Sequence, residues 1–112
     1  DKFQICNGYE HLFLPTFACG GDSIMGIAPN IVPRQLAEMY RKVKENDFKA
    51  AADINRKLVP VYNAMETSEE PCPGPVKYVL KQQGFDCGLP RKPVVDISDG
   101  MRTELDKIMK AL

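Results

Sequence analysis

The first 31 residues carry short apolar stretches separated by glycines, a pattern that predicts a strand, a helix and a second strand. Residues 3–6 include the Phe, Ile and Cys side chains of a strand buried on both faces, as parallel strands are. A short helix is predicted to begin near Leu14, because Pro15 is tolerated only in a first turn. After a glycine pair, the apolar run 23–28 predicts the second strand. Together these elements form one βαβ unit of a parallel α/β protein.

Beyond this unit, apolar residues recur three and four positions apart, which predicts helices. One helix begins at Pro33 and ends near residues 45–46. Asp47 is expected to cap a second helix, and Pro60 inside that helix is expected to bend it.

Two further helices are predicted in the last third of the chain. A polar, proline-rich loop at 68–75 leads into a helix from about residue 75 to residue 83, which Gly84 ends. After an extended connector, Ser98 is expected to cap a last helix. Its apolar face consists of Met101, Leu105, Ile108, Met109 and Leu112.

Two parallel strands cannot close a sheet, so the predicted βαβ unit needs further strands. The unit stands at the start of a chain of 112 residues, where those strands should already have come. We therefore predict that the chain is the carboxyl-terminal piece of a larger α/β barrel.

The composition excludes some classes of partner. Fifteen basic and fifteen acidic side chains cancel, so no long-range field favours nucleic acid or an anionic membrane. The longest apolar run falls short of the roughly 18 residues that a membrane span requires, so we expect a cytoplasmic protein. The four cysteines lack metal-ligand spacing and are interpreted as structural thiols. Cys6 and Cys19 fall in the predicted strand and helix, where burial is expected.

Candidate chemistry is expected after the strands, because the loops at the carboxyl ends of barrel strands carry the active site. Gly8 would let a small substrate lie against bare backbone, while Tyr9 and Glu10 would offer a hydroxyl and a carboxylate. The structural alternative is that Gly8 only makes the turn and Glu10 only favours a helix start. His11, the single histidine, has no nucleophilic partner in evident register.

No metal site or cofactor is predicted. The acidic residues Glu66, Glu69 and Glu70 lie in or beside a polar loop, and solvent exposure explains them better than metal binding. Phosphate-binding loops and the common hydrolase motifs are not found in the sequence. The five methionines, Met25 among them, fall on apolar faces, where they are expected to fill a core.

Four segments nevertheless resemble one family along the whole chain. They read ICNGYE, then ACGGDSIMGIAPNIVPR, then DFKAAADINRKLVP, then PCPGPVKYVL. In this order they are similar to the end of the dihydrodipicolinate synthase and N-acetylneuraminate lyase family. The resemblance implies that residues 1–46 are the last two βα units of a (β/α)8 TIM barrel and that residues 47–112 are a helical carboxyl-terminal extension of three helices.

The resemblance also implies a chemistry, in which pyruvate is condensed or cleaved through a Schiff base on a lysine. Gly8 would lie beside the pyruvate carboxylate or imine, with Tyr9 next to it, and Met25 would line the same pocket. The family's lysine lies upstream of Phe3, so this chain is expected to hold no catalytic residue and to be inactive alone. The resemblance leaves the exact substrate open, because an aromatic residue follows Gly8 where synthases have acidic ones, and this is nearer the lyase pattern.

The partners expected from this reading are pyruvate or another 2-oxo acid and, as protein partner, the missing amino-terminal part or further copies of the chain. Two other interpretations stay open from the residues alone. The helices could form a stand-alone interaction module whose first 31 residues pair with another chain. The other is a small active enzyme that uses His11 and Glu10.

Overall fold

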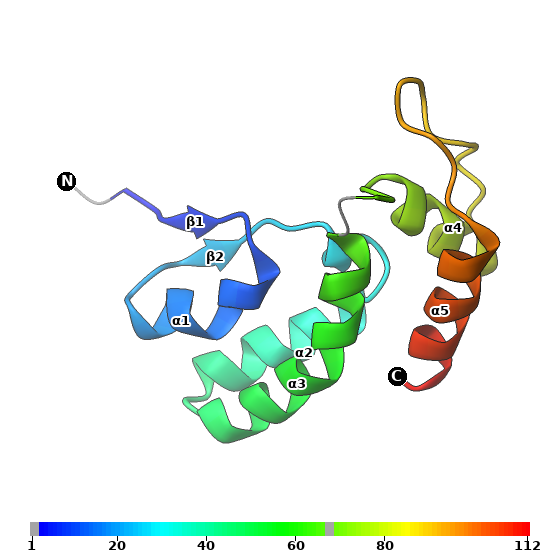
Figure 1. The fold of residues 1–112 in the computed structure, drawn as a ribbon. Coiled ribbons are helices and arrows are strands. Elements are labelled where there is room, and N and C mark those ends of the chain that lie inside the picture. Colours follow the sequence, from blue (N-terminus) through cyan, green and yellow to red (C-terminus); the bar gives the residue numbers. More distant parts are fainter. Residues whose placement is uncertain (1–2, 67–68) are drawn as a thin grey trace. The chain divides into compact units, whose positions relative to one another are not determined.

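The computed structural model describes residues 3–66 and 69–112, which divide into two compact units (Figure 1). The first unit ends at Val59 and the second begins at Pro60. This division falls inside a helix, α3 (Phe48–Met65). The boundary between barrel units and helical extension, which the resemblance places between residues 46 and 47, stays a prediction.

A parallel pair of short strands forms the amino-terminal half of the first unit, as predicted. Strand β1 (Cys6–Asn7) pairs in parallel with β2 (Ser23–Ile24), with Cys6 opposite Ser23. Between them the chain forms the 3-10 helix η1 (Glu10–Leu12) and the helix α1 (Phe13–Ala18), which lies against β2 (Figure 1). The helix begins one residue before the predicted start.

Both strands are shorter than predicted, and the reason lies in their hydrogen bonds. The Asp22 carboxylate accepts the Ile5 N–H at 2.8 Å, which removes that donor from strand pairing. At the other end, Ala28 starts a second 3-10 helix, η2 (Ala28–Asn30), instead of extending β2. Phe3 and Ile5 are exposed, so the prediction of a strand buried on both faces is wrong for the chain by itself.

The cysteine and methionine predictions are corrected in the same region. Cys6 and Cys19 are exposed free thiols and not buried ones. Met25 is 75% exposed and fills no core within this chain, whereas Met39, Met65 and Met101 are buried as expected. Cys6 lies in β1, Cys19 directly follows α1 and Met25 directly follows β2. The two-stranded sheet of the described residues covers little of their surface.

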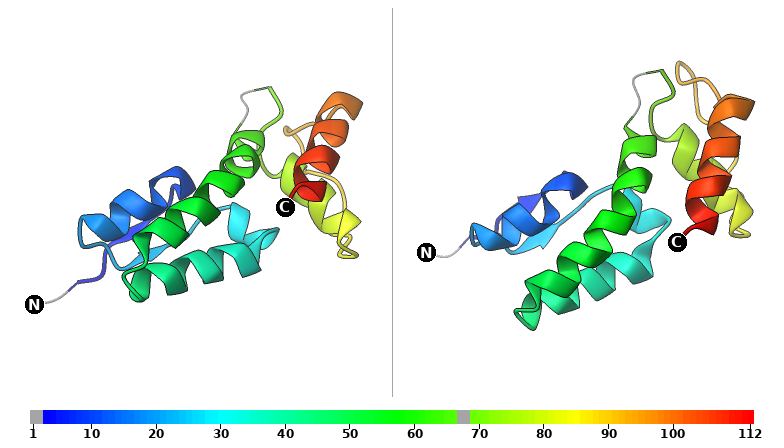
Figure 2. Two further views of the ribbon diagram at one scale, coloured as in Figure 1. Left: turned by 90° about the horizontal axis from the view of Figure 1, so that it is seen from below. Right: turned by 60° about the horizontal axis from the view of Figure 1, so that its bottom comes forward.

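Two helices complete the first unit. The helix α2 (Pro33–Lys44) begins at the predicted proline, and Asn46, in the left-handed conformation that asparagine tolerates, follows its end. Asp47 then accepts the Ala50 N–H at 3.0 Å and caps α3, as predicted. Figures 1 and 2 show α2 and the first part of α3 side by side. Their buried residues are Leu36, Met39, Val43, Ala51 and Leu58.

The second unit holds the end of α3 and a helical pair, α4 (Gly74–Gln82) and α5 (Asp99–Lys110), joined by a long loop (Figure 2). Helix α5 begins as predicted, because the Ser98 hydroxyl accepts the Met101 N–H at 3.2 Å. Glu70 in turn accepts both the N–H and the hydroxyl of Ser98, so it is a half-buried support of this cap and not simply a solvated loop residue.

Candidate functional site at the strand ends

Gly8 and Met25 lie together at the carboxyl end of the parallel pair. The Met25 N–H donates to the Asn7 carbonyl at 2.9 Å. This backbone hydrogen bond follows the paired residues of β1 and β2 at their carboxyl ends. A Cβ on Gly8 would lie 3.7 Å from the Met25 carbonyl oxygen, an ordinary contact distance. Both residues are exposed. The two positions singled out from the sequence therefore border one open surface of the first unit.

The turn that carries Gly8 is held by the side chain of Asn7. Its carbonyl oxygen accepts the Tyr9 N–H at 2.8 Å, an arrangement that lets asparagine form its own turn. Its amide nitrogen donates to the Thr16 hydroxyl at 2.7 Å, and Thr16 is buried in α1. Asn7 therefore connects the turn to the helix behind it, a role that the sequence analysis missed.

Glu10 takes a position that differs from both sequence-based readings. Its side chain is only 3% exposed, and its Oε1 atom accepts the Ala28 N–H at 2.6 Å. A Cβ on Gly26 would overlap the Glu10 carboxyl group, so the absence of a side chain at residue 26 provides the space for it. The group that lies close to Gly26 is therefore a side-chain carboxyl group.

The two rings that follow Gly8 lie next to each other. Tyr9 is 45% exposed, and its ring stacks on His11 with 4.9 Å between ring centroids. Glu10 is turned towards Ala28, on the second segment. The structure thus brings Gly8, Tyr9 and Met25 to one end of the sheet.

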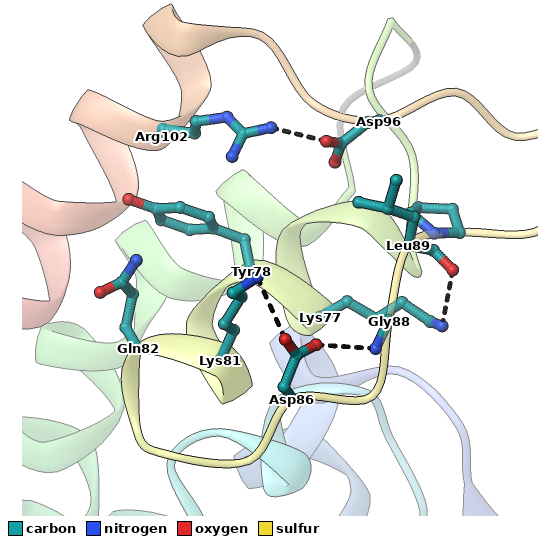
Figure 3. A pocket seen from close by; sticks show the side chains of 10 residues that line it. Lys77, Tyr78, Lys81, Gln82, Asp86, Gly88, Leu89, Asp96 and Arg102 are labelled. Carbon is teal, nitrogen blue, oxygen red and sulfur yellow. Dashed lines mark hydrogen bonds and ion pairs between the residues drawn. The ribbon is translucent and has the colours of Figure 1, made fainter.

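A separate pocket of about 370 Å³ lies within the second unit, between α4, α5 and the loop that joins them (Figure 3). The Lys77 ammonium donates to the carbonyls of Cys87 and Leu89, both at 3.0 Å. Arg102 pairs with Asp96 at 2.6 Å, and its guanidinium lies over the Tyr78 ring at 5.4 Å. These cations hold the protein's own loop, so the pocket has a structural explanation.

Two groups at this pocket have shifted pKa values. Burial, together with a hydrogen bond to Asp106, raises the pKa of Tyr78 above its ordinary value. The pKa of Asp86 is lowered, first by the Gly88 N–H that it accepts at 2.9 Å and then by Lys81 at 3.1 Å. Both shifts favour the protonation states that these side chains have at neutral pH.

Acidification is expected to break the hydrogen bond that the Gly88 N–H donates to Asp86. Because the folded pKa of Asp86 is lowered, its stabilising contribution is present above the ordinary value of about 3.9 and is lost as the pH falls through the lower folded value. The Gly88 amide signal, followed by NMR between pH 7 and 2, should show an inflection below the ordinary value. In Asp86→Asn, which keeps an acceptor but cannot ionise, this inflection should vanish. An unshifted inflection in the unaltered protein would contradict the assignment.

The sequence does not predict the hydrogen bond from Asn7 to Thr16 or the contact of Glu10 with Ala28. The spacing of sixteen residues between Glu10 and Gly26 gives no local signal. A polar residue at the end of a strand, followed by glycine, is the signal that points to Asn7.

Comparison with known proteins places these features in one family. The dihydrodipicolinate synthetase family model matches residues 1–112. The 4-hydroxy-tetrahydrodipicolinate synthase of Listeria monocytogenes is 36% identical over 112 residues, which are the whole of this chain and 38% of that protein. The corresponding synthase of Methanocaldococcus jannaschii is 33% identical over 111 residues.

Solved structures give the same result. A dihydrodipicolinate synthase from Bacillus anthracis superposes with a TM-score of 0.91 at 28% identity, over all of this chain and 38% of that one. The N-acetylneuraminate lyase of Proteus mirabilis, at 22% identity and a TM-score of 0.79, shares the fold over 93% of this chain and 35% of its own.

The fold and the sequence define an α/β chain that corresponds to part of the TIM-barrel fold of dihydrodipicolinate synthases. The chain belongs to the dihydrodipicolinate synthetase family, and it spans about 38% of the length of the curated relatives that it matches. The family resemblance drawn from the sequence is confirmed.

Two kinds of feature are absent from the described part of the chain. Among residues 3–66 and 69–112, no helix is long and apolar enough to cross a bilayer. Within the same ranges, no three His, Cys, Asp or Glu side chains gather as a metal site.

Proposed function

We propose that this chain supplies the last two βα units and the carboxyl-terminal extension of a pyruvate-dependent class I aldolase, either a synthase or a lyase. In this proposal Gly8 and Tyr9, from the turn after β1, and Met25, from the segment after β2, line the pocket for pyruvate or another 2-oxo acid. The enzyme works in the cytoplasm without a metal or organic cofactor and assembles from several copies.

The observation that carries the proposal is the parallel register of β1 and β2 within a match that covers the whole chain. Parallel strands bring their carboxyl ends to the same edge, where barrel enzymes hold their substrates. Gly8 offers bare backbone there, and the exposed Met25 side chain is free to border a ligand. The arrangement suits positioning, because neither residue can act as a nucleophile or a base.

The reactive amine is proposed to lie outside residues 1–112. A Schiff base needs a lysine whose pKa the site lowers, and the resemblance assigns that lysine to the barrel strand before Phe3. Without it, the remaining residues orient substrate but form no bond to it. We therefore expect the 112-residue chain to be inactive by itself.

Borohydride trapping with pyruvate tests this assignment. Reduction of a pyruvate imine leaves a stable adduct on the lysine, which peptide mass spectrometry locates. We expect the full-length protein that carries this chain to be labelled at one lysine outside residues 1–112, and the 112-residue chain alone to stay unlabelled. Pyruvate captured on a lysine within this chain would contradict the assignment.

The mass of the natural product separates this proposal from the interaction-module interpretation. A parent open reading frame that begins far upstream is expected, with a product well above the 12.5 kDa of this chain. A natural product that consists of these residues alone would contradict the aldolase proposal. The family match covers the helices as well as the strands, so we propose one function only.

A further inference from the structure

We propose that Glu10 is a positioning residue that fixes the separation of Gly8 and Met25 and thereby tunes pyruvate binding. The inference rests on the proposed function, which assigns the substrate to these two residues. Glu10 itself is not proposed to touch the substrate.

The first support is the path of the Glu10 side chain. It starts two residues after Gly8, on the segment that follows β1, and its Oε1 atom accepts the Ala28 N–H, on the segment that follows β2, at 2.6 Å. The strand ladder ends with the Met25 N–H, which donates to the Asn7 carbonyl. The hydrogen bond to Glu10 therefore joins the two segments again at Ala28, three residues after Met25.

The second support is the seat that receives the carboxyl group. Gly26, directly after Met25, leaves the space in which the carboxyl group lies, and any Cβ there would overlap it. The φ angle of Gly26 is not positive, so its backbone conformation does not require glycine. The structure instead explains this glycine by its contact with Glu10. Glu10 thus sets how closely the segment bearing Met25 approaches the turn bearing Gly8.

The third support is the burial of a polar group. Glu10 is only 3% exposed, and burial of a carboxyl group is unfavourable unless hydrogen bonds compensate for it. A glutamate that only favoured the start of η1 would remain in solvent at the helix end. The observed position, turned across to Ala28, indicates a cross-link between the strand ends.

Positions of this kind have large effects, because a displacement of about 1 Å at a site can lower a rate about a hundredfold. The test measures imine formation in the full-length protein as a function of pyruvate concentration, which separates the half-saturating concentration from the limiting rate. Glu10→Ala should raise the half-saturating concentration about tenfold or more. Glu10→Gln, which keeps the acceptor and the shape, should restore it to within about threefold of the original value.

Gly26→Ala provides an independent arm. Alone, it should displace the Glu10 carboxyl group and weaken pyruvate binding as Glu10→Ala does. In the Glu10→Ala background it should add little, because the group that it would displace is gone. Fully additive effects would refute the proposed contact.

The remaining outcomes are also decisive. An unchanged dependence on pyruvate concentration in Glu10→Ala would overturn the inference. Equal impairment of Glu10→Gln and Glu10→Ala would also overturn it, because the charge of the carboxylate would then be what substrate binding requires. If Glu10→Ala does not fold, Glu10→Asp, which shortens the reach to Ala28, replaces it with the same expectation of weaker binding. Failure of the unaltered full-length protein to form a trapped adduct would instead refute the proposed function.

Discussion

Alanine at position 8 is expected to weaken pyruvate binding by the full-length protein about a hundredfold while leaving its fold intact. The backbone of Gly8 does not have the positive φ that would demand glycine, and an added Cβ would meet the Met25 carbonyl oxygen at 3.7 Å. The methyl group therefore fits the protein. It would, however, occupy the open surface on which the proposed substrate lies. A displacement of about 1 Å lowers reaction rates about a hundredfold in enzymes, and we expect pyruvate binding to weaken to a similar extent.

The pyruvate dependence of imine trapping measures this effect, and thermal unfolding checks the fold. Gly100→Ala is the matched control, because residue 100 lies in α5 and a Cβ there would meet only the Ser98 hydroxyl at 3.5 Å. It should leave pyruvate binding unchanged. Normal binding by Gly8→Ala would remove Gly8 from the proposed substrate site.

The second large effect concerns stability. Leu58→Ala should lower the free energy of unfolding by about 2–5 kcal/mol, because Leu58 is fully buried and its removal leaves a cavity that the neighbouring side chains fill only in part. Urea denaturation of the full-length protein measures the change. Its neighbour Lys57 is exposed on the same helix, so Lys57→Ala should change stability by less than about 0.5 kcal/mol. Equal effects of the two substitutions would contradict the burial assigned to α3.

The helices could be predicted from the sequence because local signals determine their ends. Asp47 and Ser98 cap their helices as predicted, and Pro33 begins α2. The apolar spacing of α2 also identifies its buried residues Leu36, Met39 and Val43, since a helix turns its period-3.6 face towards the core. Tyr40 belongs to the same predicted face but is exposed. These features depend on residues within about four positions of one another.

The strands and the site could be predicted only in outline. The order and parallel direction of β1 and β2 follow from the βαβ pattern, but the exposure of Phe3, Cys6 and Met25 is set by tertiary contacts, which a local apolar pattern does not show. The contact between Glu10 and Gly26 joins residues far apart in sequence, and no periodicity or motif indicates it. Side-chain packing across a turn is a tertiary property, and it needs coordinates.

The short, two-stranded sheet also bears on how such a polypeptide fares in a cell. Among the described residues, β1 pairs only with β2, so its other side presents unpaired backbone donors and acceptors beside the apolar side chains of Phe3 and Ile5. An unpaired edge of this kind can pair with an extended segment of another polypeptide. We expect a polypeptide of these 112 residues to bind chaperones and to aggregate through this edge.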